Sequence, residues 1–150
     1  MRFTQLSPEC EALRQQIKAL VPTTTTRDDQ INNTREALMS SEKPDGSKLY
    51  GGYDIHSKLA HMAVKIRVGD DMIYKVVSWP DTPVFSFAEE RGFIIPLHEI
   101  RAVTGTFQEG YMVQVNVNEG DFVEFVGKGT AILIVPRKNG VARGALWPME

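Results

Sequence analysis

The first clear pattern along the chain is a run of apolar residues at helical spacing between residues 7 and 21. Ser7 is a favourable N-cap residue, Pro8 suits the first helical turn, and Pro22 ends the pattern. One side of this predicted helix is apolar and the other is polar; the apolar side carries Cys10, Leu13, Ile17, Leu20 and Val21, and the polar side carries Arg14, Gln15, Gln16 and Lys18. Because such a helix buries its apolar side, we expect it to dock on the rest of the chain.

A second, weaker helix is predicted for residues 27–41. Thr25 or Thr26 can cap its start, and Asp28 and Asp29 lie in its first turn. Its apolar stripe is thin, so we expect this helix to be half exposed or to lie against a partner chain. Residues 40–48, with the sequence SSEKPDGSK, combine Pro, Asp and Gly and predict a loop.

From about residue 60 the pattern changes to the two-residue period of strands. The segments AVKIRV and MIYKVVSW flank GDD, which predicts an antiparallel hairpin with Val64, Ile66 and Val68 on one side. Residues 50–68 are therefore interpreted as a loop that leads into the first long strand. Shorter strands follow from residue 93 onwards and predict a meander, in which Tyr111, Val113, Val115 and Val117 face the core.

The segment AILIV, residues 131–135, is apolar on both sides of a predicted strand. Strands of half-exposed antiparallel sheets alternate apolar and polar residues, so this strand belongs in the middle of a sheet that is covered on both faces. We expect the helix at 7–21, or another subunit, to cover the second face.

These elements predict an α+β fold, with two N-terminal helices followed by a mainly antiparallel, strongly bent sheet or small β-barrel of about seven strands. The predicted organisation is an N-terminal helical region, residues 1–45, that packs on or extends from the core, and an antiparallel β domain, residues 46–150.

Composition adds limits on compartment and partners. The 150 residues are 42% hydrophobic and 24% charged with a net charge of −2, which is typical of one soluble domain and does not favour binding to nucleic acid or to an anionic membrane. The longest apolar run is far shorter than the roughly 20 residues of a membrane span. A single cysteine and the lack of a signal-peptide pattern predict an intracellular, cytoplasmic protein.

Four side chains have the chemistry of a metal site, and they are Asp54, His56, His61 and His98. His56 and His61 are five residues apart, which places them on one side of neither a strand nor a helix, and the HExxH spacing is absent. We therefore favour the interpretation of His56 as a loop residue and His61 as the first residue of a strand. A metal-dependent hydrolase that uses these four residues stays the third hypothesis.

Other catalytic patterns are weaker. Cys10 lies on the apolar side of the first helix, which favours a packing role, and the paired carboxylates at 70–71 and 89–90 lie in turn-like segments. The glycines at 51–52 and 127–129 lack the strand, turn and helix order of a phosphate-binding loop. No cofactor is expected, and an enzyme is the less favoured class.

Basic residues near the C-terminus suggest an anion site. Lys128, Arg137 and Arg143 could hold a nucleotide or another anion between subunits, with Phe107 or Tyr111 stacked on it. A solvated hairpin tip explains the same basic residues.

Two functions of different classes follow. The first is a non-enzymatic assembly or interaction module that forms a homo-oligomer or joins a larger protein assembly, such as a virion accessory protein or an inhibitor-type protein. The alternative is a protein that binds a small anionic ligand at sites between subunits.

Overall fold

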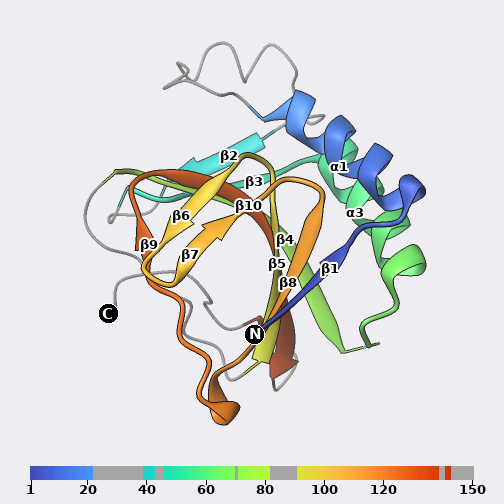
Figure 1. Ribbon diagram of the computed structural model, residues 1–150. Coiled ribbons are helices and arrows are strands. Elements are labelled where there is room, and N and C mark those ends of the chain that lie inside the picture. Colours follow the sequence, from blue (N-terminus) through green and yellow to red (C-terminus); the bar gives the residue numbers. More distant parts are fainter. Residues whose placement is uncertain (22–38, 43–45, 70, 82–90, 139–140, 143–150) are drawn as a thin grey trace.

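The computed structural model describes residues 1–21, 39–42, 46–69, 71–81, 91–138 and 141–142 (Figure 1). These residues form two α-helices, α1 (Pro8–Leu20) and α3 (Tyr53–Ile66), and one short 3-10 helix, η2 (Val117–Glu119). The strands are β1 (Arg2–Gln5), β2 (Met39–Glu42), β3 (Lys48–Gly51), β4 (Met72–Trp79), β5 (Arg91–Pro96), β6 (Ile100–Ala102), β7 (Gly105–Phe107), β8 (Tyr111–Asn116), β9 (Phe125–Val126), β10 (Gly129–Lys138) and β11 (Val141–Ala142). The predicted α+β class is confirmed.

The strands form two sheets, and every strand pair among the described residues is antiparallel. The large sheet has the order β1-β8-β5-β10-β4-β3-β2, with β11 paired to β10, and the small sheet has the order β7-β6-β9. Both orders have two open ends within the described part of the chain. The prediction of a small barrel is therefore wrong; the strands that were assigned to one bent sheet divide between two sheets.

Helix α1 forms where the sequence predicts it. The Ser7 side chain accepts a hydrogen bond from the Cys10 backbone N–H at 3.2 Å, and Pro8 begins the helix. Cys10 and Ile17 are buried, as expected for the apolar side. Arg14 is the exception on the polar side, because only 1% of it is exposed.

Helix α3 replaces the predicted loop and strand at 50–68. Its buried residues Ile55, Leu59 and Met62 follow the helical spacing of four and three residues. Gly52, at a φ of 106°, precedes the helix, and Arg67, at a φ of 57°, ends it in the left-handed region that normally favours glycine.

The two-residue alternation at 64–68 misled the prediction of a strand. Val64 is 63% exposed on α3, whereas Ile66 packs against the buried cluster beneath the helices. Both α-helices of the described chain pack on the same side of the large sheet. Because α3 follows β3 in the sequence, the prediction of two N-terminal helices before the strands is wrong.

The second predicted helix, at 27–41, falls mostly on residues 22–38, which lie outside the described part. Its end is wrong, because residues 39–42 form β2 and pair with β3 from Met39 opposite Gly51 to Glu42 opposite Lys48. Residues 40–42, predicted as loop, belong to this hairpin.

The molecule has three layers, which Figure 1 shows as the two helices on one side of the large sheet and the small sheet on the other. Ile132 and Ile134 of β10 lie in the cluster on the helix side, together with Ile17 of α1 and Ile55 of α3. The alternate residues of β10, Ala131, Leu133 and Val135, lie in the cluster on the small-sheet side. The prediction that 131–135 is a central strand covered on both faces is confirmed, and α1 and α3 together cover one face.

Of the four residues at 111–117 that were predicted to face the core, two are buried. Val113 and Val115 are fully buried, but Tyr111, which begins β8, and Val117, the first residue of η2, are 37% and 39% exposed. The division into residues 1–45 and 46–150 stays a prediction, although residues 2–5 pair with β8 in the large sheet. None of the described helices is long and apolar enough to cross a membrane.

Candidate functional site

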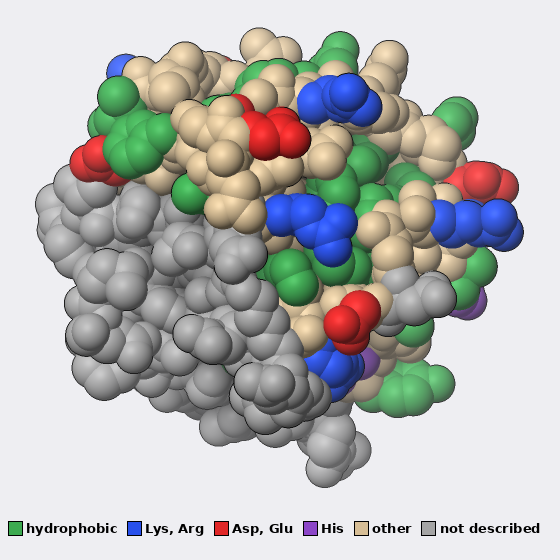
Figure 2. Space-filling view, turned by 90° about the horizontal axis from the view of Figure 1, so that it is seen from below, with side chains coloured by type: hydrophobic (Ala, Val, Ile, Leu, Met, Phe, Trp, Pro, Cys, Tyr) green, Lys and Arg blue, Asp and Glu red, His purple; other side chains and the backbone are tan. Residues whose placement is uncertain are grey.

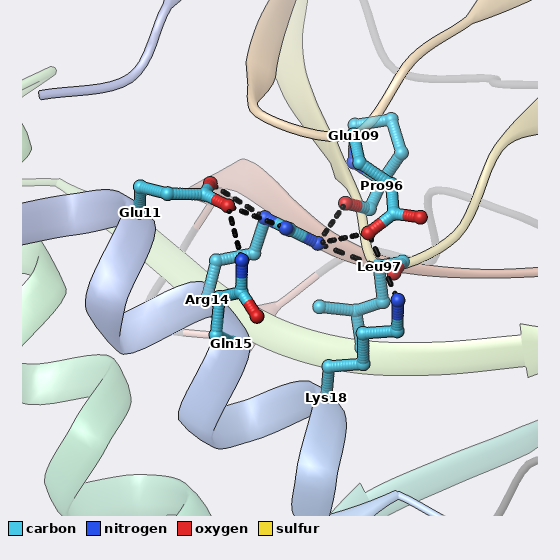
Figure 3. A network of polar contacts seen from close by, with 7 residues as sticks. All are labelled: Glu11, Arg14, Gln15, Lys18, Pro96, Leu97 and Glu109. Carbon is cyan, nitrogen blue, oxygen red and sulfur yellow. Dashed lines mark hydrogen bonds and ion pairs between the residues drawn. The ribbon is translucent and has the colours of Figure 1, made fainter. Parts of the chain in front are cut away.

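The side chain of Arg14 is the centre of a buried polar cluster (Figure 3). Its Nε and Nη2 atoms donate to the two carboxylate oxygens of Glu11 at 2.7 and 2.6 Å. Its Nη1 atom donates to Glu109 Oε1 at 3.0 Å, to the Leu97 carbonyl at 3.2 Å and to the Pro96 carbonyl at 3.5 Å. All three guanidinium nitrogens thus have partners inside the protein.

Two further side chains complete the cluster. Lys18 Nζ donates to Glu109 Oε1 at 2.9 Å, and Gln15 Nε2 donates to Glu11 Oε2 at 2.9 Å. The hydrogen bond from Arg14 is the main reason that the pKa of Glu11 is lowered, and the hydrogen bond from Lys18 is the main reason that the pKa of Glu109 is lowered. Both carboxylates are therefore held in the ionised form.

His98 lies beside this cluster, directly after Leu97. Burial is the main cause of its lowered pKa, and the positive charges of Lys18 and Arg14 act in the same direction, while Glu109 opposes them. The neutral imidazole is therefore favoured.

The Arg14 cluster joins three segments that are distant in sequence. Glu11, Arg14 and Lys18 belong to α1, Pro96 ends β5 and Leu97 follows it, and Glu109 lies in the turn between β7 and β8. Because a buried charge is costly unless it is paired, these contacts fix α1 against the two turns. The cluster is a structural anchor, since its donors already have partners.

Acid should weaken this anchor. Because the folded-state pKa values of Glu11 and Glu109 lie below the unfolded value of about 4.3, the stabilisation is fully present above that pH and is lost as the pH falls through the lower folded values. We expect the free energy of unfolding, measured in urea, to decline below about pH 4.5. The double variant Glu11→Gln with Glu109→Gln should decline less than the wild type, whereas the control Glu119→Gln should follow the wild type. An equal decline in the double variant would contradict this assignment.

The residues predicted to bind a metal are divided between two parts of the structure. Asp54, His56 and His61 lie on α3, and His98 follows β5 beside the Arg14 cluster. On a helix, residues five apart point about 140° away from each other, so His56 and His61 do not converge. Among the residues that the structure describes, no three His, Cys, Asp or Glu side chains are grouped so that they could hold a metal ion.

The residues predicted to bind an anion do not form a common site in the described chain. Phe107 is 1% exposed, and its ring lies 5.7 Å from Phe3 and 6.4 Å from Phe125, so it cannot stack on a ligand. Tyr111 begins β8 opposite Gln5, and Lys128 is exposed between β9 and β10. Arg137 lies near the end of β10, where its backbone N–H donates to the Asp71 carbonyl at 2.8 Å, and Arg143 lies outside the described residues.

A different candidate site is the outer face of the small sheet. Val103, Phe122 and Val126 are 61%, 53% and 47% exposed, and we call them the small-sheet surface. The Val103 N–H donates to the Glu124 carbonyl at 2.8 Å, so Val103 lies opposite Glu124. Val126, two residues after Glu124, is therefore the diagonal neighbour of Val103, whereas Phe122 lies in the segment just before β9.

Charged side chains lie next to this apolar surface. Arg101 is exposed opposite Val126, and the partly exposed Glu124 lies between Phe122 and Val126 in sequence. On the face of the molecule seen from below, Figure 2 shows hydrophobic side chains exposed between Lys, Arg, Asp and Glu side chains. An apolar group with adjacent charges is typical of a protein-binding surface.

Sequence reasoning missed both features. The buried role of Arg14 depends on Glu109, 95 residues away, and a helical pattern alone places Arg14 on the solvent side. The alternation of Phe122, Glu124 and Val126 with buried Val123 and Phe125 was a readable strand signal, but it does not say that the Phe122 side faces outward.

Comparison of the chain with protein-family models, with curated proteins and with solved structures gives no match.

Proposed function

We propose that this chain is a non-enzymatic assembly module that associates with other protein chains, in the simplest case as a homo-oligomer. The observation that supports it is the small-sheet surface, where three large apolar side chains on or next to β6 and β9 are about half or more exposed. Single exposed apolar residues are common on monomeric proteins, whereas a group of them is enriched at protein interfaces.

The place of this surface in the fold supports the same proposal. The small sheet buries its inner face, with Phe107 and Phe125, against the large sheet. Its outer face forms one external layer of the molecule, so a partner can reach Val103 and Val126 without any change in the core. Association there would remove apolar area from water, which is the main favourable term in most protein–protein contacts.

The test is the mass of the purified protein by light scattering from about 1 μM to about 1 mM. The expected result is a mass of at least two chains at the upper end. Phe122→Ser should lower the mass of any species that uses the small-sheet surface, while Gln16→Ser, on the exposed side of α1, should not. A monomer over the whole range would contradict the homo-oligomer.

A further inference from the structure

The outermost strip of α3 holds no Asp, Glu, Lys or Arg, and Asp54 and Lys65 lie on one flank of it. At about 100° per residue, Tyr53, Ser57, Ala60 and Val64 form a central strip opposite the buried side, and His56 and His61 lie toward its two edges, about 140° apart. Tyr53 is 74% exposed and Val64 is 63% exposed, which makes them the two most exposed large apolar side chains among the described residues. The solvent side of a surface helix is normally charged, so this face has the composition of a contact surface.

These six residues have a symmetric spacing. The pairs 53 and 64, 56 and 61, and 57 and 60 all share one midpoint, between residues 58 and 59. A second α3 that runs antiparallel about a two-fold axis at this midpoint would place Tyr53 level with Val64 of the second copy, and His56 level with His61. The small residues Ser57 and Ala60 would meet in the middle, where small side chains allow two helices to approach closely.

The charges at the edge of this face are complementary in the same arrangement. Asp54 lies near the start of α3 and Lys65 near its end, on the same flank of the helix. In the antiparallel pair, Asp54 comes within about two residues, or about 3 Å along the axis, of Lys65 of the second copy. The two-fold axis makes this ion pair twice. Lys58 lies further round the helix, outside the contact face.

Lys65 is able to take part in such a contact. Its present partner is Glu9 of α1 at 3.6 Å, and the two side chains are 46% and 69% exposed. An exposed ion pair of this length contributes little to stability, so exchange of one carboxylate for another costs little.

We propose that α3 is the surface through which two copies of this chain associate, as an antiparallel dimer about a two-fold axis. This inference rests on the proposed function and specifies one of its interfaces. Figure 1 shows α3 and the small sheet on opposite sides of the large sheet, so a dimer formed through α3 leaves both small-sheet surfaces pointing outward for further contacts.

The first variant that tests this dimer is Ala60→Glu, measured by sedimentation equilibrium or light scattering. Glu is a good helix former, and the substituted residue points away from the core, so the fold should persist. Two carboxylates would meet near the two-fold axis, and we expect the dimer dissociation constant to rise by about 100-fold or more. The matched control is Ala19→Glu, the same change at an exposed position of α1, and it should leave the dissociation constant within about three-fold of the wild type.

A charge exchange identifies the second copy as the partner. Asp54→Lys should weaken the dimer, because the introduced lysine would face the like charge of Lys65 of the second copy. The double variant Asp54→Lys with Lys65→Asp restores opposite charges and should recover at least half of the loss in binding free energy. Asp54→Lys and the double variant leave the buried side of α3 unchanged. They therefore test the α3 dimer even if circular dichroism shows that Ala60→Glu has lost its helix.

The outcomes separate this inference from the proposed function. An oligomer that is unaffected by Ala60→Glu and by Asp54→Lys would overturn the α3 dimer and leave the assembly module in place. A wild type that is monomeric at all concentrations would overturn both. Dissociation by Ala60→Glu, with recovery in the charge exchange, would support both.

Discussion

Replacement of either Ile132 or Leu133 by alanine is expected to lower the free energy of unfolding by about 3 kcal/mol, which is typical of a buried Ile or Leu that leaves a cavity. The two residues are neighbours on β10 and point to opposite faces of the large sheet, Ile132 toward the helices and Leu133 toward the small sheet. Both are fully buried. The two losses in free energy of unfolding should therefore be similar. In a strand with one face open to water, only one of two neighbouring residues is buried, and the two losses would differ.

Denaturation in urea, at a protein concentration low enough to avoid association, measures both variants. Val117→Ala is the matched control, because it removes apolar atoms from a residue that is 39% exposed in η2, and it should cost less than about 1 kcal/mol. If one of the two β10 variants were as mild as the control, the three-layer arrangement around β10 would be contradicted.

Replacement of Arg14 by alanine is expected to cost about 3 kcal/mol, because it removes one partner from a buried, charge-assisted network. The carbonyls of Pro96 and Leu97 would lose a donor, and Glu11 would lose both of its hydrogen bonds from the guanidinium. The partial exposure of Glu11 and Glu109 keeps the loss from being larger, since water can solvate the carboxylates that remain.

Thermal and urea denaturation of Arg14→Ala, compared with Arg14→Met and Gln16→Ala, measures the contribution of the Arg14 network to stability. Arg14→Met keeps most of the apolar stem and should recover only part of the loss. Gln16→Ala, on the exposed side of the same helix, should stay within about 0.5 kcal/mol of the wild type. A cost of less than about 1 kcal/mol for Arg14→Ala would show that the network contributes little.

The parts of the fold that were predicted correctly are those in which local pattern and burial agree. The N-cap at Ser7 and the apolar spacing after it are sufficient to define α1. The segment 131–135 was placed correctly because five apolar residues in a row have no solvent side, whatever the order of the other strands.

The wrong predictions come from segments in which two periods compete. Val64, Ile66 and Val68 alternate as in a strand, while Ile55, Leu59 and Met62 repeat as in a helix, and the buried set belongs to the helix. Packing against α1 and the large sheet decides between the two periods, and a single sequence does not contain that information. The separation of β6, β7 and β9 into a second sheet depends on pairing at a distance in the same way.

The candidate surfaces depend still more on the complete fold. The residue types of the predicted metal set were a fair reason to group Asp54, His56, His61 and His98, but the helix turns two of the histidines apart and His98 lies beyond β5. Phe107 looked like a residue for stacking on a ligand until its burial between the sheets was known. What a surface residue contacts is decided by tertiary structure, and residue type alone does not separate the exposed Phe122 from the buried Phe107.

The central position of β10 has a consequence for the order in which the chain can complete its sheet. On one side of β10 lie β5, β8 and β1, on the other lie β4, β3 and β2, and no strand of one group pairs with a strand of the other in the described chain. Until residues 129–138 are available, β5 and β4 each lack the neighbour that satisfies one of their edges in the folded protein. Pairing of β10 with both β5 and β4 joins the two groups of strands into one continuous sheet.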